Sequence, residues 1–313
     1  MRSMTQISRA GFLLITITAA AIASGCNREK TATAPAVALV VKTLNNAFFI
    51  EMEKGARAAA DSLGLKLEVQ APEREIDVEK QMQIVENLIQ GQVGVIALVP
   101  SGSREIVPAV VKANAANIPV VTVDTRVDAA ALSAAGGHVA TFIGSDNVDG
   151  GRMAGEFVAQ RLNGQGRVAV LEGIPGHETA DSRLRGFRQA LSAHPGLRIV
   201  ASQTANWERD QAFNVTQNIL QSHPDIQAIF ACNDVMALGA VEAVAAAGKT
   251  KDIAIVGFDA QDDARTALRQ GRMAATIAQN PREMGRLAIV SAYRILHHEP
   301  VPAEQPVKIE LVK

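Results

Sequence analysis

The chain has 313 residues, 48% apolar and 20% charged, so it has material for a substantial core and length for two domains. A net charge of −1 and the lack of a Lys- or Arg-rich run argue against a nucleic-acid partner. With only Cys26 and Cys232, a disulfide framework is excluded.

Residues 1–25 have the pattern of a bacterial lipoprotein signal peptide. Arg2 and Arg9 precede an apolar run over 11–23, which is too short for a comfortable membrane span. The run ends in Ala-Ser-Gly-Cys, which is similar to a lipobox, and this similarity implies that Cys26 is acylated as the first mature residue. An ordinary cleaved signal with an incidental Cys is the alternative.

The stretch 26–35 is polar and small, without periodicity, and we interpret it as a tether between the lipid and the folded body. Because several acyl chains anchor a protein far better than one, the body would stay at a membrane surface. The sequence therefore predicts an exported protein of the periplasm or cell envelope, lipid-anchored through Cys26.

Seven short apolar runs predict the strands of the body. Most are apolar on both faces, which is typical of a parallel sheet covered by helices on each side. The runs are 37–41, 93–99, 119–123, 139–143, 167–171, 226–230 and 253–257. Between them, apolar residues recur at helical spacing, as at Phe49, Met52, Ala56, Ala59 and Leu63, at Val78, Met82, Val85 and Ile89, and at Ala212, Val215 and Ile219.

This alternation predicts the fold class. Strands alternating with helices imply right-handed crossovers and a doubly wound α/β fold. The units are too many for one sheet of ordinary size, so we predict two parallel-sheet, Rossmann-like lobes. In such sheets ligands bind beyond the carboxyl ends of the strands, which is where function should lie.

Polar side chains gather at those strand ends. Lys42 follows the first run, Asp124 the third, Asn233 the sixth and Asp259 the seventh. A sugar needs such partners, because its ring of hydroxyls both donates and accepts hydrogen bonds. The sequence therefore favours a polar ligand site there.

Aromatic side chains supply the other half of a sugar site. The apolar C–H faces of a sugar lie well on aromatic rings, and Phe48, Phe49 and Trp207 are placed to provide them. Aromatic residues make up only 4% of the chain, so the position of each is informative.

Seven motifs in order resemble the ribose-type periplasmic binding proteins, which share a fold with the sugar-sensing domains of lactose-repressor-type regulators. The similarity runs from Val37 to Val312. The motifs are KTLNNAFF (42–49), IPVVTVD (118–124), SDNVDGG (145–151), ASQTANWER (201–209), CNDVMALG (232–239), VGFD (256–259) and ATIAQNP (275–281).

The resemblance implies a set of sugar-contacting residues. These are Lys42, Asn46, Phe48, Phe49, Asp124, Arg183, Trp207, Asn233 and Asp259, with Gln279 at the hinge. Lys42, Trp207 and the stretch 135–142 look more like the D-allose-binding branch than the ribose-binding one. Two positions depart from the pattern: Ala47 stands where Pro is common, and Thr125 where relatives have Arg or Glu, so the identity of the sugar stays open.

The same resemblance implies discontinuous lobes. The N-terminal lobe would comprise 36–145 with 280–305, and the C-terminal lobe 146–279 with 306–313. The chain would then cross the hinge three times, which favours closure about a hinge. We expect a monomer that binds a monosaccharide and docks on an ABC permease in the cytoplasmic membrane.

Ordinary structural interpretations compete with these roles. Asp and Asn after strands often cap helices or turns. Arg183 lies at a predicted helix start, where an Arg is usually solvated, and Phe49 falls on an apolar helical face. Trp207 could be core, although its polar neighbours favour a loop. Cys232 reads as a small buried hydrophobe if Cys26 is acylated.

Four functions remain to be compared. The leading interpretation is the binding protein of an ABC sugar importer, without enzymatic activity, metal or cofactor. The alternative is a receptor that presents a sugar or autoinducer to a membrane signalling protein. A transcription regulator would need a DNA-binding module where this chain has its export signal. A glycosidase would need paired carboxylates, which Asp124 and Asp259 could form in space.

Overall fold

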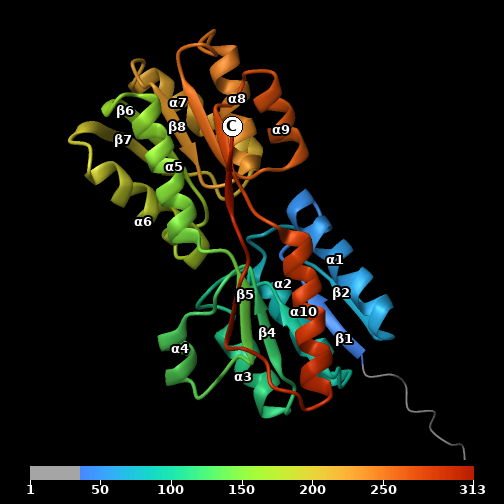
Figure 1. Ribbon diagram of the computed structural model, residues 1–313. Helices are drawn as coiled ribbons and strands as arrows, with labels where there is room; N and C mark the ends of the chain where they lie inside the picture. The colour runs from blue at the N-terminus through green and yellow to red at the C-terminus, as the bar shows by residue number, and fades with distance from the viewer. Residues whose placement is uncertain (1–35) are drawn as a thin grey trace, which may run out of the picture. The chain divides into compact units, whose positions relative to one another are not determined.

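Two six-stranded sheets organise residues 36–313, the part of the chain that the computed structural model describes (Figure 1). The predicted signal peptide, the tether and Cys26 lie outside the described residues. Within residues 36–313, no helix has the length and apolar character needed to cross a membrane.

The first sheet has the strand order β11-β5-β4-β3-β1-β2 and only parallel pairings. Its strands are β1 (Ala36–Val40), β2 (Lys66–Gln70), β3 (Val95–Leu98), β4 (Val120–Val123), β5 (Thr141–Gly144) and β11 (Glu304–Pro306). Its helices are α1 (Ala47–Leu63) and α10 (Pro281–Leu296) on one face, and α2 (Val78–Gln90), α3 (Val107–Ala115) and the short α4 (Ala129–Ala134) on the other.

Strand β1 shows why the strands of this sheet could be predicted from the sequence. Val37 and Leu39 pack in the cluster with α1 and α10, whereas Ala38 and Val40 pack in the cluster with α2 and α3. A strand that is buried on both faces needs an unbroken apolar run.

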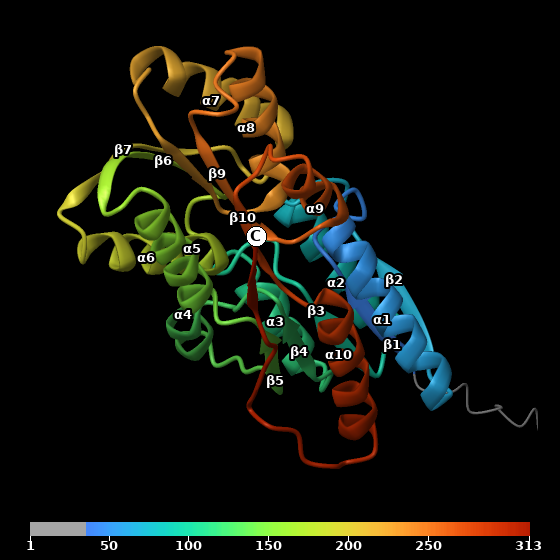
Figure 2. The same cartoon turned by 45° about the horizontal axis from the view of Figure 1, so that its top comes forward.

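The second sheet has the order β12-β10-β9-β8-β6-β7, parallel except where β12 runs antiparallel to β10. Its strands are β6 (Gln165–Glu172), β7 (Gly196–Thr204), β8 (Ala228–Ala231), β9 (Ala254–Asp259), β10 (Ala275–Ala278) and β12 (Glu310–Val312). Its helices are the pair α5 (Asn147–Arg161) and α6 (Glu178–Ser192), the pair α7 (Arg209–Ser222) and α8 (Asp234–Ala246), and α9 (Asp262–Arg269), as Figure 2 shows.

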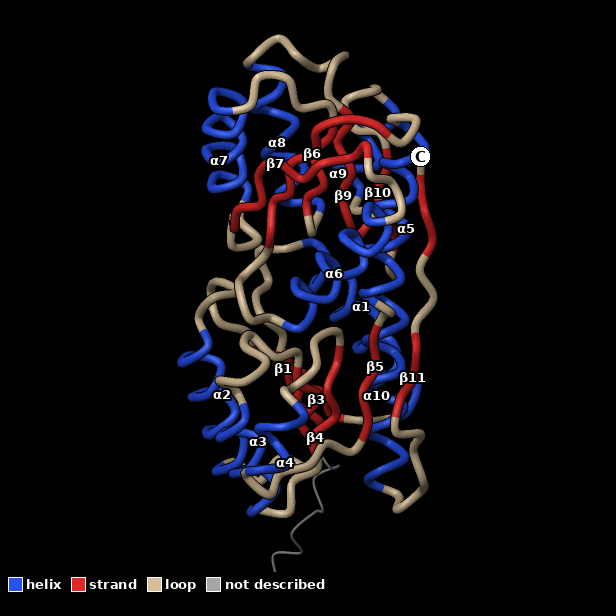
Figure 3. Tube along the Cα trace, turned by 90° about the vertical axis from the view of Figure 1, so that its left-hand side faces the viewer, coloured by secondary structure: helices blue, strands red, loops and turns tan. Residues whose placement is uncertain are grey.

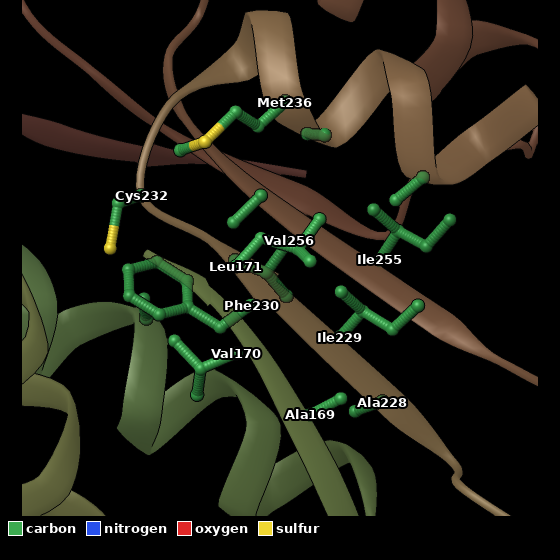
Figure 4. Close-up of a cluster of buried hydrophobic side chains, with 14 of the residues drawn as sticks. Ala169, Val170, Leu171, Ala228, Ile229, Phe230, Cys232, Met236, Ile255 and Val256 are labelled. Atoms are coloured by element: carbon green, nitrogen blue, oxygen red, sulfur yellow. The ribbon is translucent and has the colours of Figure 1, made fainter. Parts of the chain in front are cut away.

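A large apolar cluster fills the second sheet and its helix layers. Figure 4 shows its centre, where Val170, Leu171, Phe230 and Val256 come from neighbouring strands. The ring of Phe230 stacks on Phe187 of α6 with centroids 4.4 Å apart. Helix α6 is thereby held against the sheet, and its first two turns are positioned for the site described below.

The contact between α5 and α6 depends on two glycines. A Cβ at Gly151 would lie 2.0 Å from the carbonyl oxygen of Arg183, and one at Gly186 would lie 1.9 Å from that of Val148. Only Gly permits such a close approach of two helices. This close packing fixes the position of the Arg183 backbone relative to α5.

The predicted fold class is confirmed, and each of the seven predicted runs overlaps a strand. Five strands escaped prediction: β2, β7, β10, β11 and β12. Most residues of the predicted helical faces pack against the cores, but the face of α2 was incomplete. In α2 the side chain of Gln81 is fully buried, while Val78 and Met82 are half-exposed. The amide of Gln81 explains this, because it donates to the Val99 carbonyl and accepts from the Ser101 N–H, each at 2.8 Å.

The chain passes between the two sheets three times: between β5 and α5, between β10 and α10, and between β11 and β12 (Figure 3). We call the first sheet with its helices the N-terminal lobe and the second the C-terminal lobe. Pro306 pairs with Gly144 in the first sheet. The lobe boundaries drawn from the sequence remain predictions.

Candidate functional site

The ten predicted sugar-contacting residues line one cavity between the lobes, together with Glu75 and Thr179. The space between these side chains, counted out to open solvent, is about 280 Å³, so they lie close together around a small cavity. The N-terminal wall consists of Lys42, Asn46, Phe48, Phe49, Glu75 and Asp124, and the C-terminal wall of Thr179, Arg183, Trp207, Asn233 and Asp259.

Strand ends deliver most of these side chains. Lys42 and Asp124 follow β1 and β4, Asn233 follows β8, and Asp259 ends β9. Because the strands within each sheet are parallel, their carboxyl ends meet at one edge, where loops place polar groups together. Gln279 follows β10 and stands where the chain passes between the lobes.

The N-terminal wall holds a loosely paired cation. Lys42 is buried, and its Nζ lies 3.5 Å from Asp124 Oδ2 and 5.8 Å from the centre of the Phe49 ring. Lys42 Nζ donates no hydrogen bond to any atom of residues 36–313. Phe48 and Phe49 meet edge to face at 5.3 Å, and both contribute to the core as well as to the cavity. The ammonium group is therefore free to donate to a ligand.

The C-terminal wall holds a tightly fixed cation. Arg183 is only 3% exposed, so the solvated interpretation was wrong. Its Nε donates to Asn147 Oδ1 at 2.8 Å, and its Nη1 donates to the carbonyl of Cys232 at 2.7 Å. The guanidinium lies 3.7 Å from the centre of the Phe258 ring, with Nη1 3.8 Å from a carboxylate oxygen of Asp259.

Asn233 and Asp259 show how a capping role and a site role combine. Asn233 Oδ1 caps α8 by accepting from the Met236 N–H at 2.8 Å, while the residue lines the cavity. Asp259 caps no helix. Its Oδ1 accepts from Gln279 Nε2 at 2.8 Å, which links the C-terminal wall to the residue at the crossing.

Three cavity residues have positive φ angles: Asp124 at 61°, Trp207 at 66° and Asp259 at 116°. Residues other than Gly avoid this region, and such strain concentrates at functional sites. Trp207 lies in the loop between β7 and α7, and its side chain is 5% exposed, so the loop and core interpretations are both correct. Gly173 makes room for the indole, since a Cβ there would lie 2.0 Å from Trp207 Cζ2.

Two polar atoms of cavity residues are buried without a hydrogen-bond partner among residues 36–313. They are Trp207 Nε1, a donor, and Gln279 Oε1, an acceptor. Burying an unpaired polar group costs about 1–3 kcal/mol, so such atoms usually await a ligand or water. A hydroxyl group can serve both kinds of atom, because it donates and accepts.

Hydrogen bonds cross between the lobes around the cavity. Thr125 Oγ1 lies 2.9 Å from Thr179 Oγ1, and Gln261 Nε2 donates to Asn46 Oδ1 at 3.0 Å. Thr125, the departure noted in the sequence, also donates to Asp124 Oδ2 at 3.0 Å. Thr125 therefore supports the site and bridges the lobes instead of lining the cavity.

The loop before α6 adds a second bridge outside the cavity. His177 Nε2 contacts the carbonyl oxygen of Ser101, and the Glu178 N–H donates to Ser103 Oγ at 3.1 Å. Burial, reinforced by the charge of Lys42, lowers the pKa of His177 to about 3. His177 is therefore neutral in this arrangement, with Nε2 as the donor.

Burial acts in the opposite direction on the acids. It raises the pKa of Asp259 to about 7, against the lowering effects of Arg183 and of the hydrogen bond from Gln279. Behind Asp259, burial also raises the pKa of Asp234, whose carboxylate accepts from Thr276 Oγ1 at 2.7 Å and from the Gln261 N–H at 2.8 Å. Hydroxyl groups that donate hydrogen bonds to Asp259 would therefore stabilise its charged form.

Glu75 and Thr179 were missed in the sequence. Thr179 lies one helical turn before Arg183, so helical periodicity placed both on one face of α6. Glu75 gave a weaker signal, because its loop follows β2, which was not recognised as a strand.

Other chemistry finds little support in the part of the chain that the structure describes. Among residues 36–313, no group of three or more His, Cys, Asp or Glu side chains is arranged to hold a metal ion. Cys232 is fully buried, and burial raises the pKa of its thiol to about 12, which leaves it an inert thiol.

Two lobes that enclose a small polar cavity with aromatic side chains define a protein that captures a small hydroxylated ligand. Comparison with known proteins agrees. A periplasmic binding protein domain is recognised over residues 37–300, and the chain belongs to this family. Its sequence places it in the ribose- and allose-binding type, whose members serve ABC sugar importers.

Three relatives document this placement. The ribose import binding protein RbsB of Escherichia coli K12 is 41% identical over 88% of this chain and 90% of its own. The D-allose-binding periplasmic protein of the same organism is 38% identical over 79% and 80%. The crystal structure of a periplasmic solute-binding protein from Actinobacillus succinogenes 130z with bound D-allose superposes with a TM-score of 0.84, at 40% identity over 89% and 97%. The family placement favours transport over the sensing alternative.

Proposed function

We propose that this protein binds a ribose- or allose-like monosaccharide in the cavity between its lobes and delivers it to an ABC permease. The single observation that carries the proposal is the convergence of all ten predicted residues on one enclosed cavity. The allose-bound and ribose-named relatives support the choice of sugar.

The chemistry of the walls assigns the roles. Lys42, Arg183 and Asn233 donate hydrogen bonds to hydroxyl oxygens, and Asp124 and Asp259 accept from hydroxyl hydrogens. The rings of Phe48 and Trp207 take the apolar faces of the sugar. Two further polar atoms also bind hydroxyl groups of the sugar. Gln279 Oε1 accepts a hydrogen bond, and Trp207 Nε1 donates one.

Closure follows from the placement of these groups in two lobes. A sugar touches both walls only when they have come together, so it selects the closed form over the open one. The bridges from Thr125 to Thr179 and from Gln261 to Asn46 add to closure. Chemistry is limited to binding and closing, and no bond of the sugar is broken.

A sugar titration tests the proposal. The only Trp of the chain lines the cavity, so its fluorescence reports binding directly. We expect saturation at one sugar per chain with D-allose or D-ribose, much weaker binding of galactose, and unchanged sugar recovered afterwards. Absence of saturation with every monosaccharide, or turnover of a glycoside, would contradict the proposal.

We further propose that the exported protein is a monomer anchored at Cys26. The lipobox-like sequence before Cys26 supports the anchor. Wild-type protein expressed in a bacterium should incorporate labelled palmitate and behave as a monomer in light scattering, and Cys26→Ser should incorporate no label. A Cys26→Ser protein labelled as strongly as the wild type, or a wild type that forms a dimer, would contradict this part.

A further inference from the structure

Glu75 is a cavity carboxylate with one free oxygen. It is half-buried in the loop between β2 and α2 and lines the cavity. Its Oε1 accepts from Asn46 Nδ2 at 3.0 Å. Within residues 36–313, this is the one hydrogen bond that reaches the carboxylate, so Oε2 has no protein donor.

Asn46, which donates to Oε1 of Glu75, is held from three sides. Asn46 Oδ1 caps α1 by accepting from the Phe48 N–H at 3.0 Å, and it also accepts from Gln261 Nε2 at 3.0 Å. The amide can turn toward Oε2 only by breaking a helix cap and a bridge between the lobes. Asn46 therefore cannot readily serve Oε2 as well, and because Glu75 lines the cavity, Oε2 is open to a donor there.

The charges around the cavity point the same way. Lys42 is paired with Asp124 and Arg183 with Asp259, at 3.5 and 3.8 Å. Glu75 is the third carboxylate on the walls and has no ion pair among the described residues. Burial raises the pKa of Glu75, and the nearby charge of Lys42 and the hydrogen bond from Asn46 oppose that rise. A half-buried carboxylate still gains from hydrogen-bond donors, and it repels a negatively charged ligand.

We propose that Glu75 selects the ligand of this site: its free oxygen accepts a hydrogen bond from one sugar hydroxyl, and its charge keeps uronic acids and sugar phosphates out. This inference rests on the proposed sugar-binding function and narrows it to neutral sugars that carry a hydroxyl at the position facing Glu75.

The first test compares Glu75→Gln with Glu73→Gln. The amide has the shape of the carboxylate but places a donor or an uncharged acceptor at Oε2. Calorimetry with the sugar that the wild type prefers should show affinity about tenfold lower or weaker still in Glu75→Gln, as for the loss of a charge-assisted hydrogen bond. Glu73 is exposed in the same loop, so Glu73→Gln should bind as the wild type does.

The second test identifies the hydroxyl. In a series of monodeoxy derivatives of that sugar, one should lose about tenfold or more in affinity for the wild type and little further in Glu75→Gln. Losses that add for every derivative would overturn the direct contact. The matching uronic acid should bind the wild type far more weakly than the neutral sugar, and the gap should narrow in Glu75→Gln.

The outcomes separate this inference from the proposed function. A wild type that binds no neutral sugar overturns both. A wild type that binds sugar, with equal affinity in Glu75→Gln, overturns the role of Glu75 alone. Should Glu75→Gln fail to fold, the wild type still decides: equal binding of the uronic acid and the neutral sugar overturns the selection.

Discussion

The two walls of the cavity differ in how firmly the protein holds their cations. On the C-terminal wall, Arg183 donates two hydrogen bonds to the protein and lies over the Phe258 ring. On the N-terminal wall, Lys42 has no hydrogen bond among the described residues and only a 3.5 Å approach to Asp124. The protein itself thus holds the cation of the C-terminal wall, whereas our proposal gives Lys42 on the N-terminal wall its partners from the sugar.

Arg183→Met should have the largest effect, because it should lower both the affinity for the sugar and the free energy of unfolding. It removes a proposed donor to the sugar, and it takes from Asn147 Oδ1 and the Cys232 carbonyl the hydrogen bonds that Arg183 donates. We expect sugar affinity to fall by about 100-fold or more, with a clear drop in the free energy of unfolding. Calorimetry and denaturant unfolding measure the two. Arg185→Met, an exposed neighbour, should change neither.

Lys42→Met should lower sugar affinity with a smaller effect on the free energy of unfolding. Because Lys42 Nζ has no protein hydrogen bond to lose, affinity should fall by about 10- to 100-fold while the sugar-free protein loses less stability than with Arg183→Met. The same two measurements apply, with the exposed Lys54→Met as control. An equal loss of stability in the two variants would contradict the difference between the walls.

His177 should make the stability of this closed arrangement against unfolding sensitive to acid. Its pKa is about 3 in this arrangement and about 6.5 when unfolded, so the native state holds fewer protons between these values and stability is lost as pH falls below 6.5. From pH 8 to pH 5 the loss should reach about 2 kcal/mol relative to His177→Gln.

The comparison with His177→Gln isolates this residue, because Asp259 and the other acids titrate in both proteins. Gln keeps a donor for the Ser101 carbonyl without titrating. Denaturant unfolding at several pH values measures the difference, and parallel pH profiles of the two proteins would rule the effect out.

Trp207→Phe should have the smallest effect. Phe keeps an aromatic face but removes Nε1, which is buried without a protein partner. A neutral hydrogen bond contributes about 0.5–1.5 kcal/mol, so affinity should fall by about 3- to 10-fold. Calorimetry measures it, since the fluorescent probe is lost. Unchanged affinity would mean that Nε1 makes no bond to the sugar.

The central strands other than β10 could be predicted from the sequence, and the edge strands could not. β2 and β7 are the outermost strands of their sheets, and most of their residues are exposed or half-buried. A strand at an edge has less to bury, so it lacks the continuous apolar run that revealed β1 and β8. β11 and β12 have three residues each, too few for any period to register.

The residues of the site likewise fall into those that could be predicted from the sequence and those that could not. The residues after the central strands could be predicted, because parallel strands bring their ends together. The loop of Glu75 follows the edge strand β2, and its polar residues look like solvated surface until the fold places Glu75 beside Asn46. The support role of Thr125 also needs the second lobe, since its partner Thr179 lies 54 residues away.

A crystal structure of the protein grown with D-allose tests the central claim most directly. The account predicts one sugar enclosed between the lobes, with its ring between Phe48 and Trp207 and its hydroxyls on Lys42, Arg183 and Asp259. A sugar bound elsewhere, or an empty cavity at saturating sugar, would contradict it.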